Sequence, residues 1–171
     1  MESARALTTA EQLRQDAPMA TPDQTCNPRT SPQGVFVYGT LQQGEERAGA
    51  WPRSPHSRQR ATVRGILFDL GPYPAMLPGN DLVGGEFCEI TTLDMPATLQ
   101  VLDHIEGYNQ GDANLYERRV IACYLETGKT VSAYTYFLAQ SDITHALDKI
   151  AAGSDGIHLW RRGSHSRTPQ Q

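Results

Sequence analysis

Two short stretches of this sequence carry residue types that could move a proton and stabilise a developing negative charge. In the first, Glu106 follows an apolar helical stripe and precedes Gly107, which places a carboxylate at the end of a predicted helix. The helix dipole, the like charge of Asp103 and burial in a pocket would each raise the pKa of this carboxyl group. A raised carboxyl pKa suits a general acid or base near neutral pH. The alternative is an ordinary exposed residue at a helix end.

The second stretch, residues 35–41, reads as a buried strand that runs directly into a glycine turn. Val35, Phe36 and Val37 are residue types that favour strands, and Gly39 permits unusual backbone angles and a close approach to the main chain. A turn after a strand can present consecutive N–H groups to an anion or to a carbonyl oxygen. Taken alone, the pattern is more typical of a strand that simply ends in a glycine turn.

These two stretches and the segments between them resemble the γ-glutamylcyclotransferase-like family, also called AIG2-like, which includes the γ-glutamylamine cyclotransferases. Each segment is a weak signal alone, but the order of the segments is specific. The matching segments are Tyr-Gly-Thr-Leu at 38–41, the run that ends in Tyr-Pro-Ala at 65–75, Val-Gly-Gly-Glu-Phe at 83–87, Leu-Asp-His-Ile-Glu-Gly-Tyr at 102–108, and Tyr-Glu-Arg at 116–118. The resemblance covers about residues 34–138.

The resemblance implies an enzyme that acts on a small γ-glutamyl compound and needs no metal or organic cofactor. The α-amine of the substrate would attack its own γ-carbonyl and release 5-oxoproline and a free amine, with Glu106 as the catalytic general acid/base. Such a ring closure is intramolecular, so no protein nucleophile is required. The substrate's carboxylate or carbonyl would lie against the N–H groups of the turn. The substrate-binding residues expected from the resemblance are Tyr38, Gly39, Thr40, Leu41, Tyr73 and Tyr116, with Glu86 as a secondary possibility.

A rival interpretation is a non-catalytic module that kept the barrel and its pocket. Glu45, Glu46 and Arg47 stand where family members often carry an Asn, sometimes followed by His, so either the substrate contacts or the loop differ here. Glu106 favours the enzyme, because a module without chemistry need not keep an acid at that position. The sequence does not choose among γ-glutamyl amino acids, γ-glutamylamines and larger γ-glutamyl metabolites, nor does it give the oligomeric state.

The elements that must position these residues are mostly strands, with helices inserted between hairpins. This order predicts an α+β fold, a small closed β-barrel with flanking helices and a pocket at one end. Gly128 marks the turn of a hairpin. The expected strands are 61–70, 85–90, 116–126 and 130–138; the expected helices are 92–105, a turn at 48–51 and a piece at 143–151; and the expected turns are 71–74 and 80–81. Residues 52–60 read as a cationic loop. The loop is either a solvated surface segment or one in which Arg58 or Arg60 attracts an anionic substrate.

The chain has 171 residues, a length that suits one domain with a real core. Proline-broken polar sequence predicts a disordered leader over 1–33, followed by the domain at 34–152 and a loose tail at 153–171. The net charge of −4 and the lack of a central basic run argue against a nucleic-acid partner. We see no apolar run long enough for a bilayer and no signal-peptide pattern, so we expect no membrane partner and a cytoplasmic location.

Cysteine and histidine usage favours a reduced protein without a metal site. Cys26, Cys88 and Cys123 are odd in number and widely spaced, which does not make a disulfide framework. Cys88 and Cys123 fall in strand-like runs and are expected to be small buried hydrophobic residues. The five histidines are scattered, with no spacing typical of metal ligands.

Overall fold

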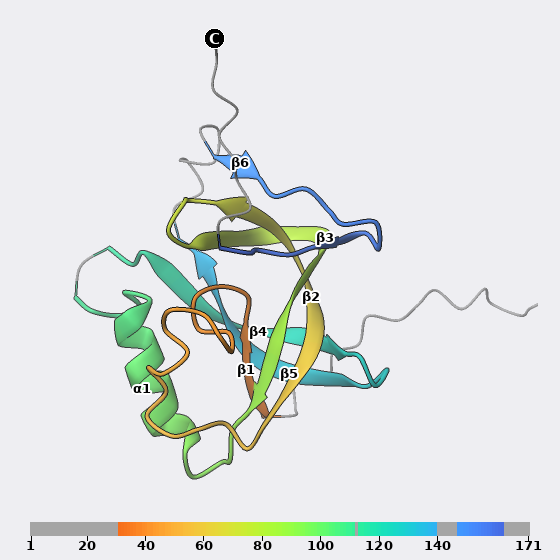
Figure 1. The fold of residues 1–171 in the computed structure, drawn as a ribbon. Helices are drawn as coiled ribbons and strands as arrows, with labels where there is room; N and C mark the ends of the chain where they lie inside the picture. The colour runs from red at the N-terminus through yellow and green to blue at the C-terminus, as the bar shows by residue number, and fades with distance from the viewer. Residues whose placement is uncertain (1–30, 112, 140–146, 163–171) are drawn as a thin grey trace, which may run out of the picture.

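The computed structural model describes residues 31–111, 113–139 and 147–162 (Figure 1). The first five strands are long enough to build a sheet, and the last two are short additions at its margins. In chain order the elements are β1 (Gly34–Val37), β2 (Ser57–Asp69), β3 (Pro74–Glu89), α1 (Met95–Ile105), β4 (Tyr116–Leu125), β5 (Thr130–Leu138), β6 (Asp148–Lys149) and β7 (Ile157–His158).

Five strands close into a barrel in the order β2-β4-β5-β1-β3, with β3 pairing back to β2. The β1–β5 pairing is parallel and the other pairings in the barrel are antiparallel, so the sheet is mixed. A register shift after Gly65 leaves residues 78–80 of β3 without partners on β2, and such an irregularity bends a sheet toward closure. The predicted closed barrel of an α+β protein is confirmed. One helix, rather than several, flanks it in the described residues.

Strand β1 is buried on both faces because it separates two apolar cores. Phe36 points into the barrel, while Val35 and Val37 face the side that carries α1. All three are almost completely buried, and each such side chain contributes roughly 1.5–3 kcal/mol by leaving water. Double burial also explains why β1 shows a continuous apolar run rather than alternation. The β1 end is therefore a rigid platform for the glycine turn that follows it.

Helix α1 lies against one side of the barrel (Figure 1). Its C-terminal end is fixed by a Schellman motif. Leu102 is fully buried under the helix. The N–H of Tyr108 donates to the Asp103 carbonyl at 2.8 Å, and the N–H of Gly107 donates to the His104 carbonyl at 3.3 Å. Gly107 has a φ of 63°, which a residue with a side chain rarely adopts. This motif makes Glu106 the C-cap residue, as the glycine predicted.

Several local predictions differ from the structure. Strand β2 begins at Ser57, so Arg58 and Arg60 lie on a strand and not in a cationic loop. Residues 80–81 belong to the long strand β3 rather than to a turn, because β2 pairs along almost its whole length. Residues 48–51 form no helix. The predicted hairpin is confirmed: β4 and β5 join around Gly128, which has a φ of 83°.

Both predicted chain ends fall partly outside the described residues. Of the leader predicted at 1–33, only 31–33 are described, and the N–H of Gln33 donates to the Ser132 carbonyl at 2.9 Å. The tail predicted from residue 153 is described as far as 162, and within it β7 pairs with β3 and Trp160 is buried in the barrel core. Of the helix predicted at 143–151, residues 143–146 lie outside the described residues, and the described remainder contains the strand β6.

Cys88 and Cys123 are free and fully buried, which confirms the expectation of small hydrophobic residues. Burial raises the pKa of both thiols to about 12, so neither is a reactive thiolate. Cys26 lies outside the described residues. Among the described residues, no helix is both long enough and apolar enough to cross a bilayer.

Candidate active site

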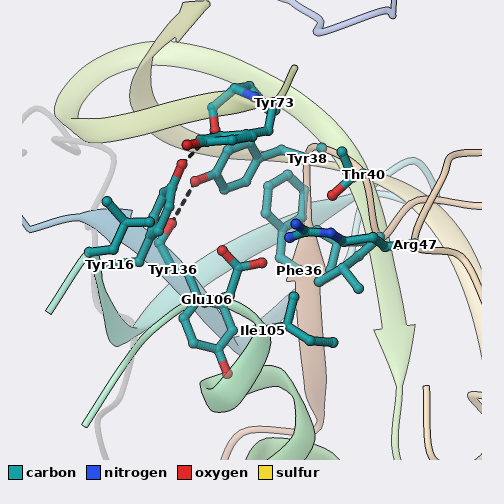
Figure 2. Close-up of a pocket in the computed structure, with 14 residues that line it drawn as sticks. Phe36, Tyr38, Thr40, Arg47, Tyr73, Ile105, Glu106, Tyr116 and Tyr136 are labelled. Atoms are coloured by element: carbon teal, nitrogen blue, oxygen red, sulfur yellow. Dashed lines mark hydrogen bonds between the residues drawn. The ribbon is translucent and has the colours of Figure 1, made fainter. Parts of the chain in front are cut away.

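A cavity of about 130 Å³ lies between the turn after β1 and the C-terminal end of α1 (Figure 2). The start of β3 and the start of β4 complete its walls, together with one residue of β5. Its lining residues are Phe36, Val37, Tyr38, Gly39, Thr40, Leu41, Arg47, Tyr73, Pro74, Ile105, Glu106, Leu115, Tyr116 and Tyr136. Glu106 and the six substrate-binding residues that the resemblance implied all line this one cavity, although they lie far apart in the chain, whereas the secondary candidate Glu86 does not line it. Their chemical roles stay predictions.

The turn at Gly39, Thr40 and Leu41 presents free N–H groups because its carbonyls are already used. The Gly39 carbonyl accepts from the N–H of Gln42 at 3.0 Å, and the Thr40 carbonyl accepts from the N–H of Arg47 at 2.8 Å. The Leu41 carbonyl accepts from the indole N–H of Trp51. None of the three N–H groups donates to any described residue. Since unpaired main-chain donors beside a cavity are uncommon, this turn is equipped to bind an oxygen atom.

Gly39 is required here for close packing rather than for an unusual backbone angle. Its φ is not positive, so the unusual backbone angles that a glycine permits are not used here. A Cβ at this position would lie 2.8 Å from the Cγ and Cδ atoms of Pro74. The glycine therefore lets the turn lie directly against the start of β3, which brings the N–H groups to the cavity wall.

Glu106 directs its carboxylate into the cavity, as Figure 2 shows. Burial raises the pKa of this carboxyl group to about 7, and the nearby charge of Arg47 opposes the increase. No described residue donates a hydrogen bond to the carboxylate or forms an ion pair with it. A carboxyl group that is unpaired and half-ionised near neutral pH can both accept and return a proton.

Asp103 does not contribute to that pKa in the way the sequence suggested. Its side chain points to β4 and β5, where one oxygen pairs with Arg118 Nη1 at 2.5 Å and the other accepts from the Tyr136 hydroxyl at 2.7 Å. Arg118 is thus the structural partner of a carboxylate, and its guanidinium also lies over the rings of Tyr108 and Tyr134. This cluster ties the end of α1 to the barrel and so holds Glu106 over the cavity.

Three tyrosines in the cavity wall act as fixed donors rather than as bases. Tyr38 donates to the Tyr136 carbonyl at 2.8 Å, and Tyr116 donates to the Pro74 carbonyl at 2.9 Å (Figure 2). Burial, reinforced by nearby negative groups, raises the pKa of Tyr38, Tyr116 and Tyr136. The hydroxyl of Tyr116 therefore does not bond Glu106 but braces the cavity wall beside it. Tyr73 lines the same wall.

Arg47 is the charged residue of this cavity wall that the sequence analysis did not predict. The departure from the family pattern at residues 45–47 was the available signal, but nothing in it showed that Arg47 turns inward while Glu45 does not. By contrast, Glu86 does not line the cavity. It accepts from the Gln43 N–H at 2.9 Å and pairs with Arg58 at 3.2 Å, and Arg58 also lies over the Trp51 ring. Arg58 is thus a structural partner of Glu86 and Trp51, and it is not a cationic side chain that faces the cavity.

Metal-based chemistry finds no ready ligand set in the part of the chain that the structure describes. No group of three or more His, Cys, Asp or Glu side chains there could hold an ion. The cavity instead combines free main-chain N–H groups, one unpaired carboxylate and one arginine on a rigid barrel. Groups of these kinds, on a closed barrel, are those that an acyl-transfer site uses to hold a carbonyl oxygen and to relay a proton.

The chain belongs to the family described as gamma-glutamyl cyclotransferase, AIG2-like, whose model matches residues 35–161. It is therefore a cyclotransferase enzyme by family. A curated relative from Niallia circulans, gamma-L-glutamyl-butirosin B gamma-glutamyl cyclotransferase, is 36% identical over 112 residues, which cover 63% of this chain and 68% of the relative.

A solved AIG2-like protein from Mus musculus has a similar fold. The two structures superpose with a TM-score of 0.53 at 21% sequence identity, and the match covers 80% of this chain and all of the mouse chain. At that identity the comparison supports the fold alone, and the family assignment depends on the sequence matches.

Proposed function

We propose that this protein releases 5-oxoproline and a free amine from a small γ-glutamyl compound. The observation that carries the proposal is the unpaired Glu106 carboxylate, with a pKa of about 7, in the same cavity as the free N–H groups of the glycine turn. The family match and the relative named for a γ-glutamyl substrate support a γ-glutamyl group as the reacting part.

The reaction balances without a covalent enzyme intermediate. The α-amine nitrogen forms a bond to the γ-carbonyl carbon, and the bond from that carbon to the leaving nitrogen then breaks. Glu106 takes the proton from the attacking amine and returns it to the leaving amine, so the carboxylate is regenerated. The attack closes a five-membered ring within one molecule, and binding a folded-back substrate removes most of its entropic cost.

The N–H groups of Gly39, Thr40 and Leu41 supply the electrostatic part of the mechanism. Negative charge develops on the γ-carbonyl oxygen as the amine attacks, and donors fixed on a rigid turn stabilise this charge without rearranging. The turn is rigid because each of its carbonyls is already bonded. The hydroxyl groups of Tyr38 and Tyr116 are committed to main-chain carbonyls, so they shape the cavity rather than move protons.

A panel of γ-glutamyl compounds tests the proposal. The purified protein is incubated with γ-glutamyl amino acids, γ-glutamylamines and γ-glutamyl conjugates of larger amines, and both 5-oxoproline and the free amine are quantified. We expect equal amounts of both products from at least one class, and release that is roughly 10³-fold slower from Glu106→Gln. Folded protein that releases 5-oxoproline from no member of the panel would instead support a binding module that kept the barrel.

A further inference from the structure

Arg47 brings an unused guanidinium group to the cavity. It is the one cationic side chain among the described residues that line this cavity. Within the described ranges its side chain makes no hydrogen bond and no ion pair. Other arginines of the domain are committed to carboxylates, namely Arg53, Arg58, Arg118, Arg119 and Arg162.

The main chain of Arg47 is tied to the turn that carries the free N–H groups. Its N–H donates to the Thr40 carbonyl at 2.8 Å, which fixes where the side chain begins. Figure 2 shows the guanidinium beside Thr40 and directed across the cavity toward the Glu106 carboxylate. Arg47 is an exposed residue that also lines the cavity, so its side chain is accessible to a ligand that enters from solvent.

The polar groups of a γ-glutamyl head can be matched to the cavity one by one. The head carries an α-amine, an α-carboxylate and a γ-carbonyl. The amine must lie near Glu106 to lose its proton, and the carbonyl must lie at the N–H groups of the turn, where its oxygen gains negative charge. The α-carboxylate would be repelled by Glu106, and only Arg47 offers it a positive partner with a planar pair of donors.

We propose that the Arg47 guanidinium binds the α-carboxylate of the γ-glutamyl group and thereby selects substrates in which this carboxylate is free. The inference rests on the proposed function, in which the N–H groups of the glycine turn bind the γ-carbonyl and so are not available to the α-carboxylate. It makes Arg47 a specificity-determining residue that contacts substrate. The departure from the family pattern at this position is then a change in how the head group is held.

A turnover experiment with two substrates and three proteins tests this assignment. One substrate has a γ-linked neutral amine and a free α-carboxylate, and the other is its α-carboxamide. Wild type is expected to prefer the carboxylate by roughly 10- to 100-fold in kcat/KM, the range of a hydrogen-bonded charged contact. Arg47→Gln should lose most of that preference and Arg47→Lys should keep part of it. Arg53→Gln, which removes an exposed arginine at the other end of α1, should behave as wild type.

A binding experiment without turnover separates this inference from the proposed function. Calorimetry compares 5-oxoproline with its carboxamide, 5-oxoprolinamide, on wild type, Arg47→Gln and Arg53→Gln. Tighter binding of 5-oxoproline that disappears only in Arg47→Gln supports the assignment even if no panel substrate is turned over.

Two results would overturn the assignment. The first is an Arg47→Gln variant that has the circular dichroism spectrum and unfolding midpoint of wild type and yet weakens both members of each pair equally. The second is wild-type protein that binds or turns over acid and amide alike.

Discussion

Asp103 and Glu106 lie one helical turn apart, yet the barrel treats their carboxylates in opposite ways. Asp103 faces β4 and β5, and both of its oxygens are occupied, by Arg118 at 2.5 Å and by the Tyr136 hydroxyl at 2.7 Å. Glu106 faces the cavity, accepts no hydrogen bond from a described residue, and has only Arg47 across from it. The Asp103 carboxylate links α1 to the barrel, and the Glu106 carboxylate is available to a ligand.

The contrast shows that the position of the counter-charge, and not the residue type, decides what a buried carboxylate does. A paired carboxylate stabilises the ionised form and holds two elements together. An unpaired one is destabilised by burial, which raises its pKa and makes proton transfer near neutral pH feasible. The two are linked, because the Asp103 cluster holds the helix end that carries Glu106.

The largest expected difference between the two carboxylates is in activity. Glu106→Gln should lower kcat by roughly 10³-fold, because the proton has no carrier, a role worth 10²–10⁴-fold in other enzymes. Asp103→Asn should retain most of the kcat of wild type under conditions where it is folded. Release of 5-oxoproline measured on both variants decides the point, and comparable losses in the two would erase the proposed division of roles.

Stability should respond in the opposite order. Asp103→Asn leaves the Arg118 guanidinium, whose side chain is only 24% exposed, without its ion pair. We expect a loss of about 2 kcal/mol in the free energy of unfolding, since an unpaired and partly buried charge costs more than the pair contributed. Urea unfolding near neutral pH measures it. Arg119→Gln, which breaks an exposed pair on the same strand, is the matched control and should cost much less.

Glu106→Gln should stabilise the protein at high pH. The folded pKa of Glu106 is raised from 4.5 to about 7, so its favourable contribution is complete below about pH 4.5 and is lost as the pH rises through about 7. The full shift corresponds to an upper bound of about 3 kcal/mol, and solvent in the cavity reduces this to about 1–2 kcal/mol.

Unfolding of wild type and of this variant near pH 5 and near pH 9 tests the sign. The variant should be more stable than wild type only at the higher pH. Glu126→Gln, an exposed carboxylate, should show no such crossover. A variant that is equally destabilised at both pH values would mean that Glu106 is paired like Asp103.

Tyr136→Phe should have a smaller effect on stability. It removes the hydrogen bond to Asp103 but leaves the Arg118 pair and the carbonyl that accepts from Tyr38. We expect a loss of about 1 kcal/mol in the free energy of unfolding, the ordinary value of a buried hydrogen bond. In the Asp103→Asn background the same change should cost less, and strictly additive losses would argue against a shared cluster.

The smallest effect concerns the pH dependence of turnover. The kcat/KM of wild type should rise with pH through an apparent pKa near 7, as Glu106 becomes a base. Arg47 lowers the pKa of Glu106, so Arg47→Gln should move this limb to higher pH. The limb is read from initial rates of 5-oxoproline release over the pH range, and a shift to lower pH would contradict the electrostatic link between the two residues.

The sequence predicted the two ends of the site well because each depends on local signals. A β-branched run followed by Gly39 specifies a strand and a turn, and an apolar stripe followed by Gly107 specifies a helix that ends at Glu106. The β4–β5 hairpin is equally local. What failed were boundaries set by pairing with distant strands, such as the start of β2, the continuity of β3 across residues 80–81, and the packing of Trp160.

The sequence by itself determined which residues could do chemistry and in which elements they lie, since periodicity and glycine positions act over a few residues. Only the tertiary structure decided which partner each side chain meets. Closure of the barrel joined the glycine turn to the helix end and committed Asp103 to Arg118. It left the side chains of Glu106 and Arg47 facing each other, with no hydrogen bond or ion pair to the other residues that the structure describes. These outcomes depend on strand register and helix docking, which are set by packing of the whole core and cannot be read from neighbouring residues.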